Sequence, residues 1–248
     1  MRTLGIDLSA DRSTTAMAVI DWSAGTASVL TPATRCGDEE LLQALTGLAP
    51  GDRAGIDTPF GWPAEFVRAI SAHLVADLWP GRGQDSERYR KDHLRYRLTD
   101  RIVWSQIQPA TPLAAPFNLI GAMVARWAHL EDELTARGLS VDRSGVGPIC
   151  EVYPKASRLR WHLEGTRSME RLLAAAPWLR CDPHTRSAYD ASDDAYDALV
   201  CALTARAAAL DLTTRPTAHE REQARLEGWI HLPTRGSLPL LPQRSPTA

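Results

Sequence analysis

Four aspartates have the residue type and spacing of ligands in a carboxylate metal site. Asp7 and Asp57 each close a short apolar run that has the character of a strand. Asp194 and Asp197 stand three residues apart at the start of an apolar helical pattern, so they share one helix face. Buried charges are costly unless they are paired or bind a metal. We therefore predict that these four side chains hold a divalent cation, Mg²⁺ or Mn²⁺, and carry the catalysis.

Each aspartate also has a structural interpretation. Asp7 would cap a turn at the end of its strand, and Asp57 would form an Asx turn before a proline. Acids in a first helical turn usually complement the helix dipole. We assign Asp193 to the dipole and Asp194 with Asp197 to the site. The spacing alone leaves open which of Asp193 and Asp194 faces inward.

Two further residues are candidates for the edge of the site. Glu151 ends an expected strand, where it would form a site-edge carboxylate, hold Lys155, or pair with a neighbouring arginine. Lys155 follows at a strand-to-helix turn, a position at which a side chain can meet a phosphate. An exposed lysine without such a role is the alternative.

A basic segment is the candidate for substrate binding. Residues 82–101 hold seven Lys or Arg against four Asp or Glu, with Tyr89 and Tyr96 interleaved. This composition is typical of a surface that binds the backbone and stacks the bases of a single strand. We expect Arg95 and Arg97 to contact the substrate. The alternative is an amphipathic helix with a solvated face.

The elements that position these residues follow from hydrophobic periodicity. Strand-like runs at 2–8, 14–22 and 26–30, joined by short turns, predict a three-stranded antiparallel meander. Further expected elements are a helix from residue 38, a strand closing at 57, a helix from 63, a strand at 148–153, a helix after 154, and a helix from about 192 to 210. Ser192 is a suitable N-cap for the last of these. The fold class is therefore α/β, with a mixed sheet of the meander plus parallel strands, flanked by helices. This order is that of the ribonuclease H-like fold, in which the strands of Asp7 and Asp57 are neighbours.

The chain organisation is one domain with an insertion and a tail. We expect the domain at 1–232, a helical insertion or lid at about 80–112, and a long helix at roughly 117–136. A short helix at 217–227 and a strand-like run at 228–231 close the domain. Residues 233–248 are rich in proline and serine, and we expect a flexible tail there.

Bulk composition excludes several classes of protein. The chain has 248 residues, of which 44% are hydrophobic, and its net charge of −2 predicts no general affinity for nucleic acid or anionic membrane. Its four cysteines form no C-x-x-C pair, which favours free thiols in a reducing cytosol. No signal pattern and no apolar run of about 18 residues occurs, so we expect a cytoplasmic protein without a membrane span.

An ordered set of motifs resembles the DUF429 family, which is described as predicted nucleases with a ribonuclease H fold. The matching pieces are residues 5–9, 56–63, 97–100, 151–156, 193–203 and 227–230. The acidic helix also resembles that of Holliday-junction resolvases of the RuvC type, whose Asp-x-x-Asp-Ala helix completes a carboxylate site. Asp7, Asp57, Asp194 and Asp197 match those roles, although the second resemblance does not extend over the whole chain.

The expected activity is metal-dependent hydrolysis of phosphodiester bonds in nucleic acid, with DNA, RNA and nucleotide substrates all left open. Two ions about 3.5–4 Å apart would be bridged by Asp7. One alternative is a single-core phosphotransferase or ATP-binding protein related to actin and hexokinase, with the hydroxyl-rich run 9–15 as its phosphate loop. Such kinases need two copies of the core, whereas this length holds one. The other alternative is a catalytically silent binding or scaffold domain.

Overall fold

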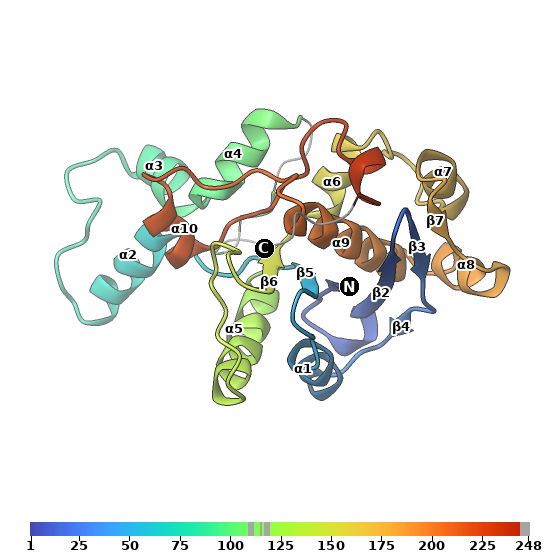
Figure 1. Cartoon of the computed structure of the whole chain (residues 1–248). Helices are drawn as coiled ribbons and strands as arrows, with labels where there is room; N and C mark the ends of the chain where they lie inside the picture. Colours follow the sequence, from blue (N-terminus) through green and yellow to red (C-terminus); the bar gives the residue numbers. More distant parts are fainter. Residues whose placement is uncertain (109–111, 115, 117–119, 244–248) are drawn as a thin grey trace.

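The computed structural model describes residues 1–108, 112–114, 116 and 120–243. Its centre is a seven-stranded mixed sheet in the order β6-β5-β1-β2-β3-β7, with β4 paired to β2 (Figure 1). The strands are β1 (Arg2–Asp7), β2 (Ala16–Ser23), β3 (Thr26–Val29), β4 (Ala33–Thr34), β5 (Arg53–Asp57), β6 (Ile149–Glu151) and β7 (Leu179–Arg180). The prediction of a mixed α/β sheet is confirmed.

Strand directions follow the expected pattern. β1, β2 and β3 are consecutive antiparallel neighbours, so the predicted meander is present. β5 lies parallel to β1, and β6 lies parallel to β5. β2 begins later than expected, at Ala16, because Arg12–Thr14 forms a 3₁₀ turn capped by the Asp11 side chain. The two-residue strands β4 and β7 are too short to give a periodic signal in the sequence.

Ten α-helices surround the sheet in the part of the chain that is described. They are α1 (Asp38–Thr46), α2 (Ala64–Leu74), α3 (Ser86–Tyr89), α4 (Leu98–Gln106), α5 (Gly121–Ala136), α6 (Pro154–Arg160), α7 (Met169–Ala175), α8 (Pro183–Asp190), α9 (Asp193–Ala209) and α10 (Arg221–Glu227). The Ser192 hydroxyl accepts from the Ala195 N–H and caps α9, as predicted. The expected start of α5 at 117 falls on residues outside the described ranges. No helix within those ranges is long and apolar enough to cross a membrane.

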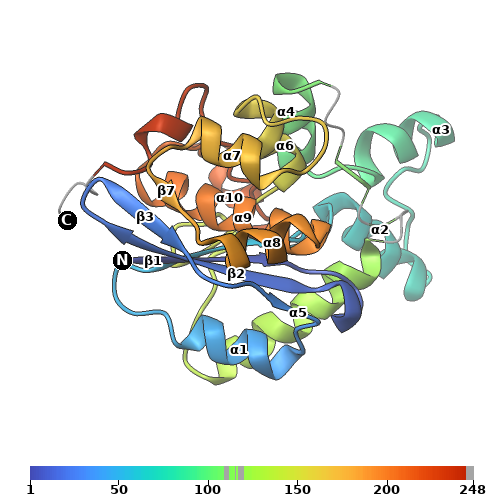
Figure 2. The same cartoon turned by 90° about the vertical axis from the view of Figure 1, so that its right-hand side faces the viewer.

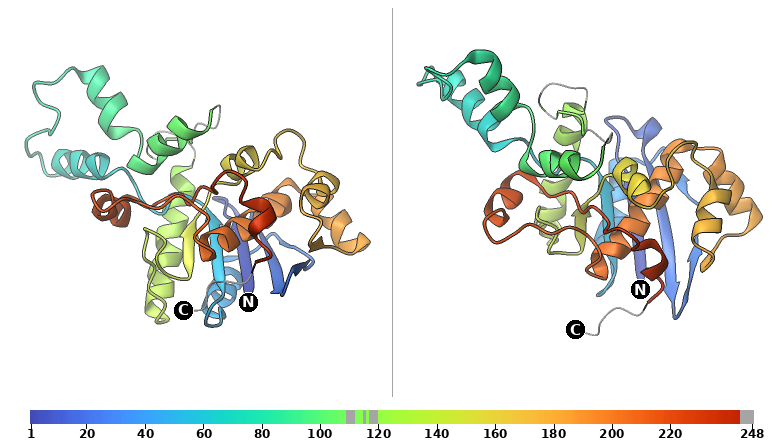
Figure 3. Two further views of the ribbon diagram at one scale, coloured as in Figure 1. Left: turned by 45° about the horizontal axis from the view of Figure 1, so that its top comes forward. Right: turned by 90° about the horizontal axis from the view of Figure 1, so that it is seen from above.

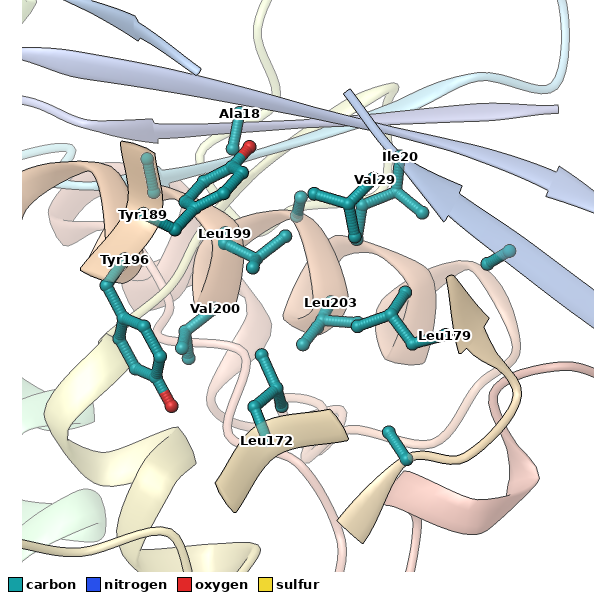
Figure 4. Packing of buried hydrophobic residues seen from close by; sticks show 14 of the residues in the cluster. Ala18, Ile20, Val29, Leu172, Leu179, Tyr189, Tyr196, Leu199, Val200 and Leu203 are labelled. Carbon is teal, nitrogen blue, oxygen red and sulfur yellow. The ribbon is translucent and has the colours of Figure 1, made fainter. Parts of the chain in front are cut away.

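The sheet separates two apolar cores. α1 and α5 cover one face, and α9 lies across the other with α6, α7 and α8 beyond it (Figures 1 and 2). Side chains alternate along a strand, so Leu4 and Ile6 of β1, with Leu8 just after it, point toward α1 and α5. On the other face, Ile20 and Val29 of the sheet pack over Leu199 and Leu203 of α9 (Figure 4).

Two glycines allow α9 to lie directly on the central strands. A Cβ atom at Gly5 would collide with the backbone of α9 at Ala198 and Ala202. A Cβ atom at Gly55 would lie 2.6 Å from the carbonyl oxygen of Cys201. The two glycines are register partners on β1 and β5. Together they create the flat patch on which α9, buried from Ala195 to Ala208, is seated.

The expected insertion at 80–112 contains α3, a π-helical turn at Arg90–Leu94 and α4. With α2 it extends from the body of the fold, beyond the β6 edge of the sheet (Figures 1 and 3). Apolar side chains at Val67, Ile70 and Leu74 on α2 are exposed. The buried side chains of Ala69, Tyr89 and Leu94 form a small local core in this part of the chain.

The C-terminal segment differs from the expectation. We expected a flexible tail at 233–248, but within the described part Leu238 and Leu241 are buried in the core beside α9. The Trp161 Nε1–H donates to the Ser237 hydroxyl at 2.9 Å. The prediction is therefore wrong for 233–243, because these leucines supply apolar anchors within a proline-rich run. Residues 244–248 lie outside the described ranges.

Candidate functional site

Asp7 and Asp57 are brought together by the pairing of two parallel strands. They are the last residues of β1 and β5, and they stand directly opposite each other in the register. Neighbouring strands lie about 4.8 Å apart. Because Gly5 and Gly55 are two positions earlier on the same strands, both carboxylates stand on the α9 face of the sheet. The predicted adjacency of the two aspartates is confirmed.

Asp7 is half-buried, and its environment disfavours its charge. Burial raises the pKa of its carboxyl to about 8, and the nearby charges of Asp197 and Asp194 add to that effect. Arg167 acts in the opposite direction. The charges of the two α9 acids therefore act on Asp7, which places three carboxylates near the carboxyl-terminal end of β1.

Asp57 has a similar environment. Burial raises the pKa of its carboxyl well above the usual range, and the charges of Asp7 and Asp197 raise it further. Glu151 has a smaller effect of the same sign. Like charges at short range cannot all ionise without a compensating cation. The acidic cluster formed by Asp7, Asp57, Asp194 and Asp197 would therefore be stabilised by a bound cation or by retained protons.

Arg167 supplies part of that positive charge. Its Nη2 lies 2.5 Å from Asp197 Oδ2, and its Nη1 lies 2.9 Å from Asp193 Oδ2. Asp193 is exposed and is directed to this arginine, whereas Asp194 is half-buried and burial raises its carboxyl pKa. This arrangement favours Asp194 over Asp193 as the inward-facing acid.

Asp197 also has an oxygen without a hydrogen bond. Its side chain is buried, and Oδ1 has no hydrogen-bond partner among the described residues. The Nε of Arg158 lies 3.6 Å from that oxygen, beyond hydrogen-bond distance. Arg158 Nε and Nη1 are themselves buried without a hydrogen-bond partner in the described structure. Buried polar atoms in native proteins are nearly always satisfied, so this oxygen marks a place where a ligand would be stabilised.

The donor chemistry of the cluster fits a hard divalent cation, since carboxylate oxygens are the ligands that Mg²⁺ and Mn²⁺ prefer. The unpartnered Oδ1 of Asp197 and the two strand-end carboxylates are the oxygens available for it. Within the described ranges, no group of three or more His, Cys, Asp or Glu side chains is placed so that it could hold a metal ion. Arg167 currently holds Asp197, so the cation would take over the charge that this arginine provides.

Glu151 belongs to a buried ion-pair network beside the site. Arg97 Nη1 and Nη2 donate to its carboxylate at 2.8 and 2.7 Å, and the Phe60 N–H donates at 2.9 Å. Arg97 also donates to Asp100 from Nε and Nη2, and to the Glu227 carbonyl from Nη1. The arginine-pair interpretation of Glu151 is therefore correct.

Arg97 was expected to contact the substrate from an exposed basic segment, and that expectation is wrong, because its guanidinium is buried and has no donor left for a phosphate. Its side chain is 1% exposed, and all five of its N–H donors are used within the protein. A buried guanidinium is tolerated only when its charge and donors are compensated. Here two carboxylates, Asp100 and Glu151, provide that compensation.

Arg95 and Lys155 remain exposed. The Arg95 guanidinium lies 5.3 Å from the centre of the Tyr96 ring, in a surface hollow shared with Trp104. None of the four aspartates lines that hollow. Lys155 is the second residue of α6 and follows β6, which is parallel to the strand of Asp57, so it stands at the same end of the sheet as the acids.

Four residues near the acids were missed by sequence reasoning. Arg158 lies 39 residues before Asp197 in the sequence, and Arg167 lies 30 residues before it. No periodic pattern connects either arginine to Asp197. Thr58 directly follows Asp57, so its proximity could have been predicted. Tyr153 lies two residues after Glu151; burial raises the pKa of its hydroxyl to about 12, and the Asp57 charge adds to the shift.

A comparison with family models bears on the same residues. A model described as "Protein of unknown function (DUF429)" matches residues 5–222, a span that contains the four aspartates and Arg167. No curated protein and no solved structure matches the chain.

Proposed function

The chain belongs to the DUF429 family, whose function is unknown, and we propose that it is a divalent-metal-dependent nuclease with a ribonuclease H-like core. One observation carries the proposal. Asp7 and Asp57 stand in register at the ends of adjacent parallel strands, with the acids of α9 over the same face. The strand order supports the fold assignment, because an antiparallel meander is followed by β5 and β6 parallel to its first strand.

Asp7, Asp57, Asp194 and Asp197 would hold Mg²⁺ or Mn²⁺. The ion would supply positive charge that lowers the pKa of a bound water and stabilises the leaving oxygen of a phosphodiester. The carboxylates would bind the ion at the carboxyl-terminal ends of β1 and β5, where α9, which is buried along most of its length, packs on the sheet. Raised pKa values of Asp7 and Asp57 mean that these groups release protons when the cation arrives.

Exposed cations outside the cluster would contact the substrate backbone. Lys155 stands at the same end of the sheet as the acids, where it can contact a phosphate. Arg95 lies with Tyr96 and Trp104 in a hollow that suits a single strand, since aromatic rings stack bases and cations pair with phosphates.

All four cysteines are free thiols, which supports a reducing, cytoplasmic location.

The test is a hydrolysis assay on a panel of substrates. Single- and double-stranded DNA and RNA, and mononucleotides, are incubated with Mg²⁺ or Mn²⁺ and either the wild type, Asp7→Asn or Asp57→Asn. We expect cleavage by the wild type and none by Asp7→Asn or Asp57→Asn. Asp21→Asn is the matched control, because Asp21 is also a strand aspartate of this sheet but pairs with Arg2, away from the cluster.

The outcomes separate the proposal from its rivals. Cleavage that is unchanged in Asp7→Asn would contradict the assignment of the site. No cleavage and no Mn²⁺-induced rise in melting temperature would favour a catalytically silent scaffold, because a cation that binds only the folded protein must stabilise it. Transfer of phosphate from ATP to an acceptor would indicate the phosphotransferase instead.

A further inference from the structure

A pocket opens directly beside Asp57. Its volume is about 270 Å³, and it lies where β5 and β6 end and α5 begins. Most of its wall is apolar, formed by side chains that include Leu113, Ile120, Met123, Val152 and Ile230. Asp57 belongs both to this pocket and to the acidic cluster, so an occupant of the pocket would lie next to the proposed reaction centre.

The Thr58 hydroxyl indicates that the occupant of the pocket is polar in part. This residue lines the pocket and is 2% exposed, yet its hydroxyl has no hydrogen-bond partner in the described part of the structure. By contrast, the buried hydroxyl of Thr204 is satisfied by the Ser157 hydroxyl and the Val200 carbonyl. An unsatisfied buried hydroxyl is costly. A ligand in the pocket that reached this hydroxyl with a donor or acceptor would remove that cost.

Part of the pocket lining is polar and held in place by hydrogen bonds. Arg97, Asp100 and Glu151 form this part, and they are joined by hydrogen bonds of 2.7 to 3.1 Å. The pocket lining therefore includes three acidic residues, Asp57, Asp100 and Glu151. It includes one arginine, Arg97, whose donors are all used within the protein. An anionic group is disfavoured inside, so a phosphate would stay outside the pocket.

We propose that this pocket receives one unpaired nucleobase of the substrate, so that the enzyme acts on single-stranded or extruded nucleotides and not on continuous duplex. The inference rests on the proposed nuclease function. Pockets that enclose a whole drug-sized ligand measure roughly 300–1,000 Å³, and this smaller one suits a single ring system. A base is flat, neutral and apolar on its faces, with donors and acceptors on its edge, which matches apolar walls plus one free hydroxyl. A base within a duplex would have to leave the stack to enter.

The first experiment uses the four common ribonucleosides as probes, because they carry no phosphodiester bond and their binding is independent of hydrolysis. Binding to the full chain is followed by chemical-shift titration or calorimetry. Met123→Trp fills the pocket from the first turn of α5 and should weaken binding roughly tenfold or more. Ala122→Trp is the matched control, because Ala122 is the exposed neighbour on the same helix and does not line the pocket.

A second pair of variants tests the hydroxyl. Thr58→Val should weaken nucleoside binding by several fold while leaving the melting temperature unchanged or higher, because the hydroxyl it removes is unsatisfied. Thr204→Val should do the reverse, lowering the melting temperature without a change in binding. Absence of nucleoside binding, or equal binding by Met123→Trp and the wild type, would overturn the proposal.

Oligonucleotides then identify the source of the base and separate this proposal from the nuclease proposal. A single strand with one abasic site at the cleaved position should be cut more slowly than the intact strand, and mononucleotides should compete with it. Nucleoside binding that Met123→Trp abolishes, without any metal-dependent cleavage, would support the pocket and remove the nuclease function. Cleavage of duplex as fast as single strand, with no abasic effect, would remove the pocket and retain the nuclease.

Discussion

Asp7 and Asp57 stand opposite each other in register across β1 and β5, so two carboxylates meet at the carboxyl-terminal ends of two adjacent parallel strands. The pKa of each is raised by burial, and the charge of Asp197 adds to both shifts. A strand pair that needed only stability would gain by replacing either aspartate with a neutral residue. The arrangement therefore has a cost that a bound cation would offset.

That cost predicts how stability depends on pH. The pKa of Asp7 is about 8 in the folded protein, compared with about 3.9 in an unfolded chain. The folded protein holds a proton that the unfolded chain has released, so wild-type stability falls as the pH rises from about 4 to about 8. Asp7→Asn removes this loss and should be more stable than the wild type at pH 8, by on the order of 1–3 kcal/mol, and similar at pH 4. Urea unfolding in EDTA measures the difference.

Asp182→Asn is the opposing control. Asp182 caps α8, and its hydrogen bonds from Thr185 lower the pKa of its carboxyl. Its loss should reduce stability at neutral pH and leave the fall between pH 4 and 8 intact. If Asp7→Asn and Asp182→Asn shifted stability in the same direction, Asp7 would be an ordinary capping residue.

Arg167 should compete with the cation. Its guanidinium binds Asp193 and Asp197, and Arg167→Gln leaves the buried Asp197 without its closest positive charge. In EDTA the variant should lose about 1–3 kcal/mol of stability, as is typical when a hydrogen bond to a charged group is removed. In Mn²⁺ its melting temperature should rise more than that of the wild type, with a lower metal concentration at half-effect.

Arg186→Gln is the control, because it also removes an arginine that lies near two acidic side chains. Arg186 is more exposed, and its acidic partners lie 3.6 and 3.8 Å away. We expect neither a loss of stability nor a change in metal response. A weaker Mn²⁺ effect in Arg167→Gln would mean that Arg167 supports the site instead of competing for it.

Arg95 and Arg97 should behave in opposite ways although they are two residues apart. Arg97→Met leaves the carboxylates of Asp100 and Glu151 buried without a partner, so it should cost about 3–5 kcal/mol of unfolding free energy. Arg95→Met should change stability by less than about 0.5 kcal/mol, because Arg95 is exposed. Arg95→Glu should weaken binding to single strands and reduce its salt dependence. Denaturation and anisotropy titrations measure the two effects, and equal stability losses would contradict the buried network.

The contrast between these arginines shows what sequence patterns can predict. Asp7 and Asp57 were predictable because each ends a Gly-Ile-Asp run, and the order of elements makes their strands neighbours. The burial of Arg97 was not, because it depends on Glu151, which lies 54 positions away. Local charge density is the same around both arginines, so no window of sequence separates them.

The same limit applies to Arg167 and to the C-terminal segment. Arg167 lies in a loop, where no periodicity indicates the direction of a side chain. Leu238 and Leu241 are buried because the core beside α9 has room for them, whereas their proline-rich neighbourhood indicated a flexible tail. Contacts across long sequence distances decide each of these cases, and composition does not report them.

The final prediction concerns the glycines that seat α9. Gly5→Ala places a methyl group against the backbone of α9 at Ala198, and neither backbone can move without disturbing a central strand or a buried helix. We expect a loss of about 1–3 kcal/mol or more, as in overpacked cores, together with a weaker Mn²⁺ response, because Asp194 and Asp197 move with the helix. Gly147→Ala is the matched control, since a Cβ there meets nothing within 4 Å. Thermal unfolding with and without Mn²⁺ measures both effects. A normal metal response in a destabilised Gly5→Ala would show that the acids of α9 are not needed for the ion, and would limit the site to the two strand aspartates.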